Sequence, residues 1–313
     1  MNNIIKLLKK DDTFGVVVSE NDFFCLNGIQ QNAHILELYI DNVLKPKPLL
    51  TQADPFLLVK DDILYLFYES QRSGEKGVIC MKKTSNLYEW SEPIVVLREH
   101  FHLSFPFVFI DNGEVYMIPE SQEVNSVRLY KGNQDMTSFS LERVLLTRKR
   151  TNDMNYSFSD SHVIKLDNIY YLFTSVVYNW TYYLELYYTD NLLLHNFVKH
   201  PKSPIYIGND FGRSGGAVIS YNGNYYRISQ NCSSSYGANI SIHQIKQIDK
   251  RNYCEELFLK DILRTNGEFY RDGGHQLSIA KFHNKYVYAT DYRRLSWSWY
   301  QQYLKLKNVI KKV

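Results

Sequence analysis

Two acidic residues flank a short stretch of the chain that has the pattern of a β-hairpin. Residues 53–70 read ADPFLLVKDDILYLFYES, so Asp54 precedes the first apolar run and Glu69 follows the second, with a turn at Asp61-Asp62. Facing residues in an antiparallel hairpin have numbers with a constant sum, and this rule makes Asp54 and Glu69 direct cross-strand neighbours. Two carboxyl groups this close titrate apart, one protonated and one ionised near neutral pH, as general acid–base catalysis requires. The alternative is a solvated strand end, where both acids point into water.

The hairpin pattern recurs four more times along the chain. Each copy has an apolar run, a polar turn and a second run with a tyrosine, and these tyrosines are 51, 55, 55 and 60 residues apart. The later copies are LSFPFVFIDNGEVYMIPES (103–121), SFSDSHVIKLDNIYYLFTS (157–175), GRSGGAVISYNGNYYRISQN (212–231) and GHQLSIAKFHNKYVYATD (274–291). A repeat of this length has room for about four strands, the size of one propeller blade. We therefore predict an all-β fold, a five-bladed β-propeller over residues 1–291, in which strands within residues 1–50 close the ring.

The turn sequences support these hairpins. Asn-Gly pairs at 112–113 and 222–223 are favoured in the two-residue type I′ turns that connect antiparallel strands. In the fifth copy the turn falls at His283-Asn284, one residue late relative to the tyrosine, so we expect a bulge or a longer loop there.

Repeat-equivalent positions place two rings of residues at one mouth of the predicted central channel. Eleven residues before the tyrosines lie Asp54, Phe105, Asp160, Gly215 and His275, and four residues after them lie Glu69, Glu120, Ser175, Gln230 and Thr290. Polar side chains that converge on strand ends of a rigid frame are where a propeller usually builds its site. The candidate catalytic residues are Asp54, Glu69, Glu120 and Asp160. The candidate substrate-binding residues are His102, His162, Arg213, Arg227, Gln230, Tyr236 and His275.

Three kinds of contact are expected from the substrate-binding candidates. Arg213 and His275 would place positive charge opposite the acids, as a phosphate group requires. Tyr236 would stack on a sugar ring. Each has a structural alternative: an ordinary ion pair for Arg213, a satisfied strand-end group for His162 or His275, and core packing between blades for Tyr236.

Six motifs give the chain a family resemblance. ADPFLL, LYLFYE, HLSFPFVF, VYMIPES, GRSGG and GHQL occur in order, and across about residues 50–290 the chain resembles five-bladed propellers related to the amino-terminal domain of plant glucosamine inositolphosphorylceramide transferase. That family also occurs in bacterial proteins linked to surface polysaccharides. More distantly, the chain resembles the furanosidase, invertase and mannoside-phosphorylase propellers. This resemblance implies that Asp54 is a catalytic base or nucleophile and that Asp160 and Glu120 complete the site, whereas Gln230 stands where an acid is expected and argues against simple hydrolysis.

Composition and charge narrow the class of protein. The chain has 313 residues with 26 Tyr and 17 Phe, which suits a β-rich fold better than a helical bundle. A net charge of +3 is too mild to predict a nucleic-acid partner. Cys25, Cys80, Cys232 and Cys254 lack CxxC spacing, so we expect buried free thiols and neither a metal nor another cofactor.

The two ends of the chain carry separate expectations. The apolar part of the opening segment is too short for a signal peptide, and no apolar run reaches about 18 residues, so we expect a cytoplasmic protein. Residues 292–313 predict a short basic amphipathic helix. That helix would lie on an anionic membrane surface or dock onto the propeller or a partner protein.

The leading hypothesis is an enzyme of surface-polysaccharide biosynthesis that transfers a glycosyl group from a phosphate-activated donor, such as a sugar nucleotide. In it, Asp54 is the base that activates an acceptor hydroxyl and Glu69 or Glu120 is the acid. Asp160 tunes or positions these groups, and Arg213 with His275 binds phosphate. Two alternatives stay open: a glycoside hydrolase of the furanosidase-like type, and a non-catalytic carbohydrate-binding propeller.

Overall fold

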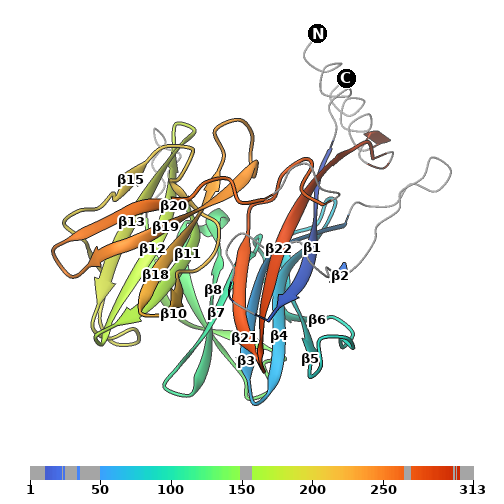
Figure 1. Cartoon of the computed structure of the whole chain (residues 1–313), viewed down its shortest axis with the longest axis horizontal. Coiled ribbons are helices and arrows are strands. Elements are labelled where there is room, and N and C mark those ends of the chain that lie inside the picture. The colour runs from blue at the N-terminus through green and yellow to red at the C-terminus, as the bar shows by residue number, and fades with distance from the viewer. Residues whose placement is uncertain are drawn as a thin grey trace, which may run out of the picture.

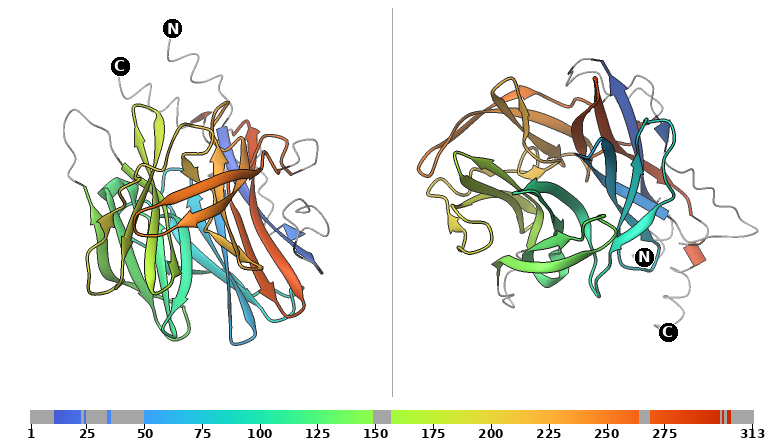
Figure 2. Two further views of the ribbon diagram at one scale, coloured as in Figure 1. Left: turned by 60° about the vertical axis from the view of Figure 1, so that its left-hand side comes forward. Right: turned by 90° about the horizontal axis from the view of Figure 1, so that it is seen from below.

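The computed structural model describes residues 11–22, 24, 34–35, 50–148, 157–263, 269–298, 300 and 302–303. In these residues the strands form five antiparallel sheets, which lie around a common centre in the view from below (Figure 2). The predicted all-β, five-bladed propeller is therefore confirmed. No helix in this described part of the chain is long and apolar enough to cross a membrane.

Four blades follow the order of the chain, and the fifth combines its two ends (Figure 1). Blade one contains β3 (Leu50–Lys60), β4 (Ile63–Arg72), β5 (Val78–Thr84) and β6 (Ile94–Leu97). Blade two contains β7 (Ser104–Asp111), β8 (Glu114–Glu120), β9 (Ser126–Gly132) and β10 (Phe139–Thr147). Blade three contains β11 (Ser157–Leu166), β12 (Ile169–Tyr178), β13 (Thr181–Thr189), β14 (Val198–Lys199) and β15 (Tyr206–Ile207). Blade four contains β16 (Arg213–Ser214), β17 (Ile219–Tyr221), β18 (Asn224–Asn231), β19 (Asn239–Ile248) and β20 (Tyr253–Leu259).

Blade five is closed by a strand from the beginning of the chain. Its strands are β21 (Leu277–Phe282), β22 (Lys285–Ser296), β1 (Asp11–Asn21) and β2 (His34–Ile35). The strand β1 pairs with β22 from Asp11 opposite Ser296 to Asn21 opposite Tyr286. Residues 292–296, which we expected in the C-terminal helix, are therefore part of a strand, because β1 offers them backbone partners. Most of the remaining tail lies outside the described residues, and so does the predicted helix.

All five inner hairpins have the two-residue turns that the repeats indicate. Asn112 and Gly113, for example, have φ values of 49° and 81°, as a type I′ turn requires. In blade five Phe282 pairs with Lys285 across the turn, and the paired residues of β21 and β22 show no register shift. The bulge or longer loop expected at this turn is therefore absent from the described hairpin.

The predicted pairing of Asp54 with Glu69 is wrong by one residue. Phe56 faces Phe67 as the turn predicts, but a bulge follows, and Glu69 faces Ala53. Asp54 lies in the bulge with a φ of 53°, a left-handed conformation that aspartate tolerates better than most residues. The same register shift occurs in blades two and three, where Phe105 and Asp160 have φ values of 44° and 48°.

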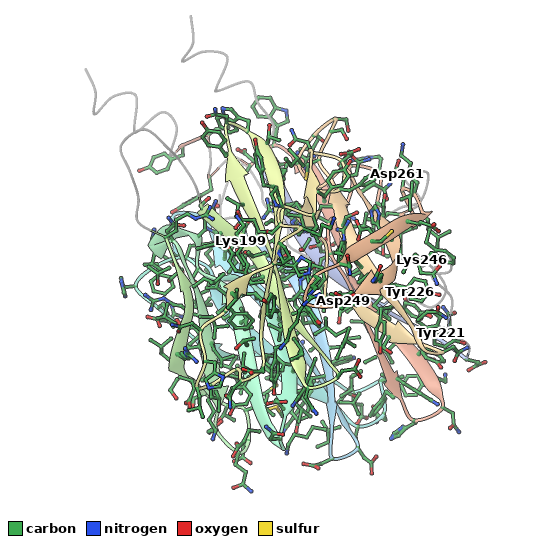
Figure 3. The ribbon with its side chains drawn as sticks, turned by 90° about the vertical axis from the view of Figure 1, so that its left-hand side faces the viewer. Lys199, Tyr221, Tyr226, Lys246, Asp249 and Asp261 are labelled. Carbon is green, nitrogen blue, oxygen red and sulfur yellow. The ribbon has the colours of Figure 1, made fainter. Side chains whose placement is uncertain are left out.

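Side chains between neighbouring blades form the core. Because residues alternate between the two faces of a strand, Leu66 on β4 packs toward blade five and Phe67 packs toward blade two. Both are completely buried. Figure 3 shows how side chains fill blades three and four, with Lys199 on β14 and with Tyr226 and Lys246 on β18 and β19. Packing on both faces fixes each blade and so fixes the strand ends at the mouth.

Three of the four cysteines lie in the described residues, and all three are free thiols. Cys80 is buried as expected, whereas Cys254 is exposed because it lies on the outer strand β20. Cys25 lies outside the described residues.

Candidate active site

Hydrogen bonds from blade to blade join the strand ends at the channel mouth. Asp291 Oδ2 accepts the backbone N–H of Asp54 at 3.1 Å, and Asp54 Oδ2 accepts that of Phe105 at 3.1 Å. Glu120 Oε2 accepts the backbone N–H of Asp160 at 3.2 Å in the same way. In each of these hydrogen bonds, the donor is the backbone N–H of a bulged residue. These acids therefore hold the blades together, a role that the repeat pattern did not indicate.

Asp54 is buried at the mouth with a strongly shifted acidity. Burial is the largest cause and raises the pKa of Asp54 to about 6. The positive charge of His275 opposes this rise, and the negative charge of Asp291 adds to it. A carboxyl group with this pKa is mostly ionised at neutral pH and basic enough to accept a proton, which suits a general base.

Burial also shifts the two glutamates of the mouth toward their protonated forms. Burial raises the pKa of Glu69 well above its usual value, and the negative charge of Asp54 raises it further. Burial likewise raises the pKa of Glu120 well above its usual value, with the charge of Asp160 as the next cause. The mouth therefore combines Asp54, a candidate base with a pKa of about 6, with two candidate acids whose protonated form is favoured by burial.

His102 directs a proton toward Glu69. The backbone N–H of Gly77 donates to His102 Nδ1 at 3.0 Å, so the imidazole proton resides on Nε2. Nε2 lies 3.4 Å from Glu69 Oε1. Burial lowers the pKa of His102, so its imidazole is uncharged at neutral pH. His102 therefore orients the Glu69 carboxyl group rather than providing a cation for substrate.

Arg213 is paired with acids of the mouth. Its Nε donates to Asp160 Oδ2, its Nη2 lies 3.3 Å from Asp160 Oδ1, and its Nη2 also lies 3.7 Å from Glu120 Oε2. Nη1 donates to the Tyr182 hydroxyl at 3.3 Å, and the guanidinium lies 4.9 Å from the centre of the Tyr236 ring. The structure thus brings Arg213 and Tyr236 together at the mouth, with the charge of Arg213 largely used by carboxylates.

His275 forms a second ion pair on the opposite side of Asp54. Its Nδ1 lies 2.6 Å from Asp291 Oδ2 and 3.6 Å from Asp54 Oδ1. Burial lowers the pKa of His275, but Asp291 and Asp54 outweigh it and the net shift is upward. The ring stacks on Phe14 of β1 at 4.4 Å, and the edge of Tyr236 contacts it at 5.2 Å.

Among the described residues, three side chains lie close enough together to be considered as ligands of one metal ion. Asp54, His275 and Asp291 each have a potential ligand atom, and these atoms lie within 4.8 Å of one another. However, Asp291 Oδ1 already accepts the backbone N–H groups of His275 and Gln276 at 2.7 and 3.1 Å. Its Oδ2 accepts the N–H of Asp54. The lone pairs of Asp291 are therefore committed within the protein, and the trio fits an ion pair better than a cation site.

The amino-acid sequence matches the model of one protein family. The family model of the N-terminal region of glucosamine inositolphosphorylceramide transferase 1 covers residues 45–286. The chain belongs to this family. A relative in Arabidopsis thaliana, named glucosamine inositolphosphorylceramide transferase 1, is 36% identical over 211 residues, which are 65% of this chain and 26% of the relative. The protein of the same name in Oryza sativa subsp. japonica is 32% identical over 216 residues, 65% of this chain and 27% of the relative. This member of the family thus aligns with about a quarter of the length of these relatives.

Solved structures share the propeller fold at low sequence identity. A family 117 glycoside hydrolase of Zobellia galactanivorans has a TM-score of 0.57 at 12% identity and covers 91% of both chains. A family 43 glycoside hydrolase of Bacillus licheniformis has a TM-score of 0.56 at 14% identity, over 81% of this chain and 55% of that chain. A family 32 β-fructofuranosidase of Bombyx mori has a TM-score of 0.56 at 13% identity, over 77% and 55%. At these identities the similarity shows the fold.

Two predicted substrate-binding residues of this family member are completely buried. Arg227 is completely buried and makes a bidentate pair with Glu255 at 2.7 and 2.5 Å. His162 is also completely buried, and its ring stacks on Phe173 at 5.2 Å. Burial lowers the pKa of His162 to about 3, so it stays neutral. Both are core residues with no surface for a substrate, because their strand positions point between blades.

Gln230 supports the site by a hydrogen bond to Asp160. It is almost completely buried, and its amide nitrogen donates to Asp160 Oδ2 at 3.1 Å and to the Ser214 carbonyl at 2.7 Å. The residue that replaces an acid in blade four thus helps to hold Asp160. Two further residues of the site, Asp291 and Phe14, were missed. Asp291 follows the ring position Thr290 by one residue, and Phe14 lies on a strand outside the repeats.

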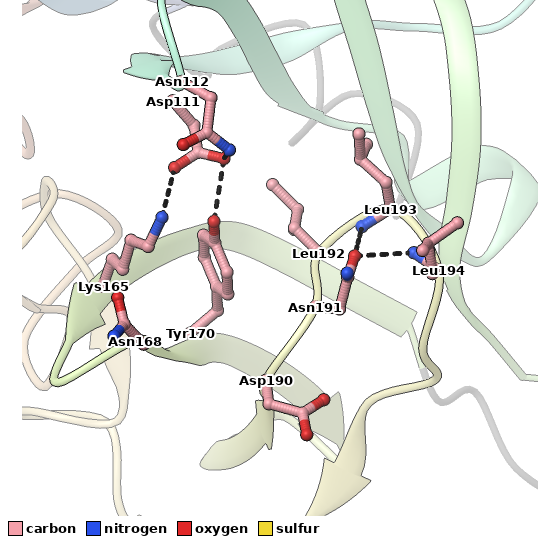
Figure 4. A pocket seen from close by; sticks show the side chains of 10 residues that line it. All are labelled: Asp111, Asn112, Lys165, Asn168, Tyr170, Asp190, Asn191, Leu192, Leu193 and Leu194. Carbon is pink, nitrogen blue, oxygen red and sulfur yellow. Dashed lines mark hydrogen bonds and ion pairs between the residues drawn. The ribbon is translucent and has the colours of Figure 1, made fainter.

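A separate cavity of about 470 Å³ lies at the turn end of blades two and three, away from the mouth (Figure 4). Its charged groups are paired within the protein: the Asp111 carboxylate accepts from Lys165 Nζ at 2.9 Å and from the Tyr170 hydroxyl at 2.8 Å. Asn191 Oδ1 accepts the backbone N–H groups of Leu193 and Leu194. These contacts stabilise loops, so the mouth remains the candidate active site.

Proposed function

We propose that this protein is a carbohydrate-active enzyme that cleaves a glycosidic bond and passes the glycosyl group to water or to an acceptor hydroxyl. The observation that carries the proposal is the set of buried carboxyl groups with raised pKa values at the mouth. Asp54 has a pKa of about 6, while the pKa values of Glu69 and Glu120 are raised well above the usual value. A candidate base and two candidate acids thus lie at one mouth, within a fold shared with glycoside hydrolases.

In the proposed reaction, Asp54 takes the proton of the attacking hydroxyl as the new bond to the anomeric carbon forms. Glu69 or Glu120 gives its proton to the leaving glycosidic oxygen, so the substrate gains one proton as it loses another. Asp160, which is paired with Arg213, would lie near the developing oxocarbenium ion. Tyr236, whose side chain is 39% exposed, offers a ring face to the sugar.

A second candidate is transfer from a phosphate-activated donor in surface-polysaccharide assembly. The curated relatives favour it, because their name describes a transferase. The geometry favours it less: Arg213 and His275, the two cations expected to bind phosphate, are already paired with Asp160 and Asp291. A phosphate group would also meet the acids of the mouth, whereas acid catalysis at a glycosidic oxygen uses them.

One experiment separates the candidates. Wild type, Asp54→Asn, Glu69→Gln and Glu120→Gln would be assayed with nitrophenyl furanosides and pyranosides, alone and with oligosaccharide acceptors, and with radiolabelled sugar nucleotides. We expect nitrophenol release by wild type and a loss of at least about a hundredfold in Asp54→Asn. Turnover of a sugar nucleotide alone would support the phosphate-donor candidate. Glycan binding that is equal in wild type and Asp54→Asn, with no product from any substrate, would support a non-catalytic propeller.

A further inference from the structure

The hairpin between β12 and β13 carries an unusually exposed aromatic residue. Its two-residue turn is Asn179-Trp180, with φ values of 46° and 63°. The side chain of Trp180 is 90% exposed, the largest value among the bulky apolar residues that the structure describes. A large residue in the left-handed region costs conformational energy, and burial does not offset that cost here. Such an exposed and strained position is a reason to look for a ligand.

The tip that bears Trp180 is held firmly in place. Asn209 Nδ2 donates to the Trp180 carbonyl at 3.1 Å, and Asn209 Oδ1 accepts the backbone N–H of Tyr182 at 3.2 Å. The backbone N–H of Gly208 donates to the Tyr182 carbonyl at 2.9 Å. One side chain therefore holds the turn and the start of β13 against the loop that leads to Arg213. A clamped aromatic ring loses little freedom when a ligand covers it.

The tip lies at the same end of the propeller as the candidate active site. The strand β12 carries Ser175 of the mouth ring, and Trp180 comes five residues later, which corresponds to about 15 Å along an extended strand. Tyr182, next to the tip, accepts a hydrogen bond from Arg213, which is paired with Asp160. The Arg213 guanidinium lies 4.9 Å from the centre of the Tyr236 ring and 5.5 Å from that of Tyr182. Contacts thus connect the carboxyl groups of the mouth to the hairpin that bears Trp180.

We infer that Trp180 is a sugar-stacking platform at the outer edge of the mouth, so that the substrate is an oligosaccharide spanning from Asp54 to the hairpin tip. The inference rests on the proposed function and names its substrate class. An aromatic face next to polar groups suits a sugar ring, which has an apolar face and hydroxyl edges. On either side of Trp180 in the sequence stand Asn179 and Thr181, whose side chains can form hydrogen bonds with such hydroxyls.

The residues around Trp180 fit a glycan better than a lipid surface. Residues 176–187 contain no Lys or Arg, so the hairpin lacks the basic residues that draw a protein to anionic headgroups. Trp180 is also a single apolar tip between Asn179 and Thr181 rather than part of an apolar face.

The test compares Trp180→Ala, Trp180→Phe, Tyr88→Ala and Asp54→Asn with wild type on an array of immobilised oligosaccharides of defined length. Tyr88 is the matched control, since it is 70% exposed but follows β5, which ends at the turn end of blade one. We expect Trp180→Ala to weaken binding of longer oligosaccharides about tenfold and to leave disaccharide binding unchanged. Trp180→Phe should retain most of the affinity, and Tyr88→Ala should match wild type.

Each contrary outcome has a distinct meaning. If Trp180→Ala binds all lengths like wild type while Asp54→Asn still loses activity, the platform is wrong and the proposed function stands. If wild type neither binds a glycan on the array nor turns over a glycoside, both fail. If wild type, but not Trp180→Ala, sediments with phosphatidylglycerol vesicles and glycan binding is unaffected, the tip is a membrane contact instead.

Discussion

Single residues set the chemistry of the mouth through the shifted pKa values of its carboxyl groups. The positive charge of His275 lowers the pKa of Asp54 and so offsets part of the effect of its burial. Glu69 has no such cation beside it: its neighbour His102 is kept neutral by burial. One buried environment therefore produces both a base and an acid.

The pH dependence of kcat/KM tests the assignment of Asp54 as the base and a glutamate as the acid. Activity should fall as pH drops through about 6, because Asp54 then takes up a proton and no longer accepts one. It should also fall on the alkaline side as the acid loses its proton. Glu69→Gln should lower the rate and remove the alkaline limb. Removal of that limb by Glu120→Gln instead would assign the acid to Glu120, and an acidic limb far from 6 would contradict the assignment of Asp54.

The stability of Glu69→Gln gives a second measurement that needs no substrate. The folded pKa of Glu69 is raised above the usual value of 4.5, so ionisation costs the folded state stability at high pH and nothing below about 4.5. We expect Glu69→Gln to be more stable than wild type by about 1 kcal/mol or more at pH 8, with the gain disappearing toward pH 4.5. Thermal unfolding at several pH values measures this, with the exposed Glu142→Gln as control. A stability gain that does not change with pH would show that folding does not raise the pKa of Glu69.

At the scale of elements, the bulges decide where the acids point. Sequence arithmetic from the turn predicted the pairing of Phe56 with Phe67 correctly and failed at Asp54, since a bulge adds one residue that the apolar pattern does not reveal. The repeats nevertheless indicated the equivalent positions in blades two and three. The acceptors that hold the bulges come from neighbouring blades, so pairing rules within one hairpin do not predict them.

Asp291→Asn tests the contact that positions Asp54. The variant keeps the shape but leaves an amide nitrogen facing backbone N–H donors of Asp54, His275 or Gln276. We expect an activity loss of about a hundredfold, because a misplaced base loses much of its effect. Ser278→Ala is the matched control: it removes the acceptor of the Leu57 N–H, another contact between blades five and one, without touching Asp54. If both variants lose the same activity for the same change in melting temperature, Asp291 has only a structural role.

At the scale of the whole molecule, the five repeats were enough to predict the propeller but not the composition of its site. A regular period with two-residue turns fixes the number of blades. The site, in contrast, includes Phe14 from β1 and Asp291 from the middle of β22, the two strands that close the ring. No local pattern predicts which residues such a closure brings together, since the distance between them in sequence is almost the whole chain.

Closure of the ring should therefore control both folding and ligand binding. The family match begins at residue 45, yet β1 covers one edge of β22 and buries Val16, Val17 and Val18. We expect a chain that begins at residue 45, and so lacks β1 and β2 but keeps β21 and β22, to aggregate, because an open sheet edge and apolar surface are exposed. Val17→Asp in the full chain should lower the free energy of unfolding by about 3 kcal/mol or more, since it buries an unpaired charge.

The control for this substitution is Asp12→Asn on the same strand. Asp12 is 40% exposed and pairs with the buried Arg293 at 2.8 Å; asparagine keeps an acceptor for the guanidinium, so this change should cost less stability than Val17→Asp. Thermal unfolding and size-exclusion chromatography compare the chains. A trimmed chain that is monomeric and melts with wild-type cooperativity would mean that four blades and the β21–β22 hairpin hold the ring without β1. Glycan binding would then show whether Phe14, which stacks on His275, is needed at the mouth.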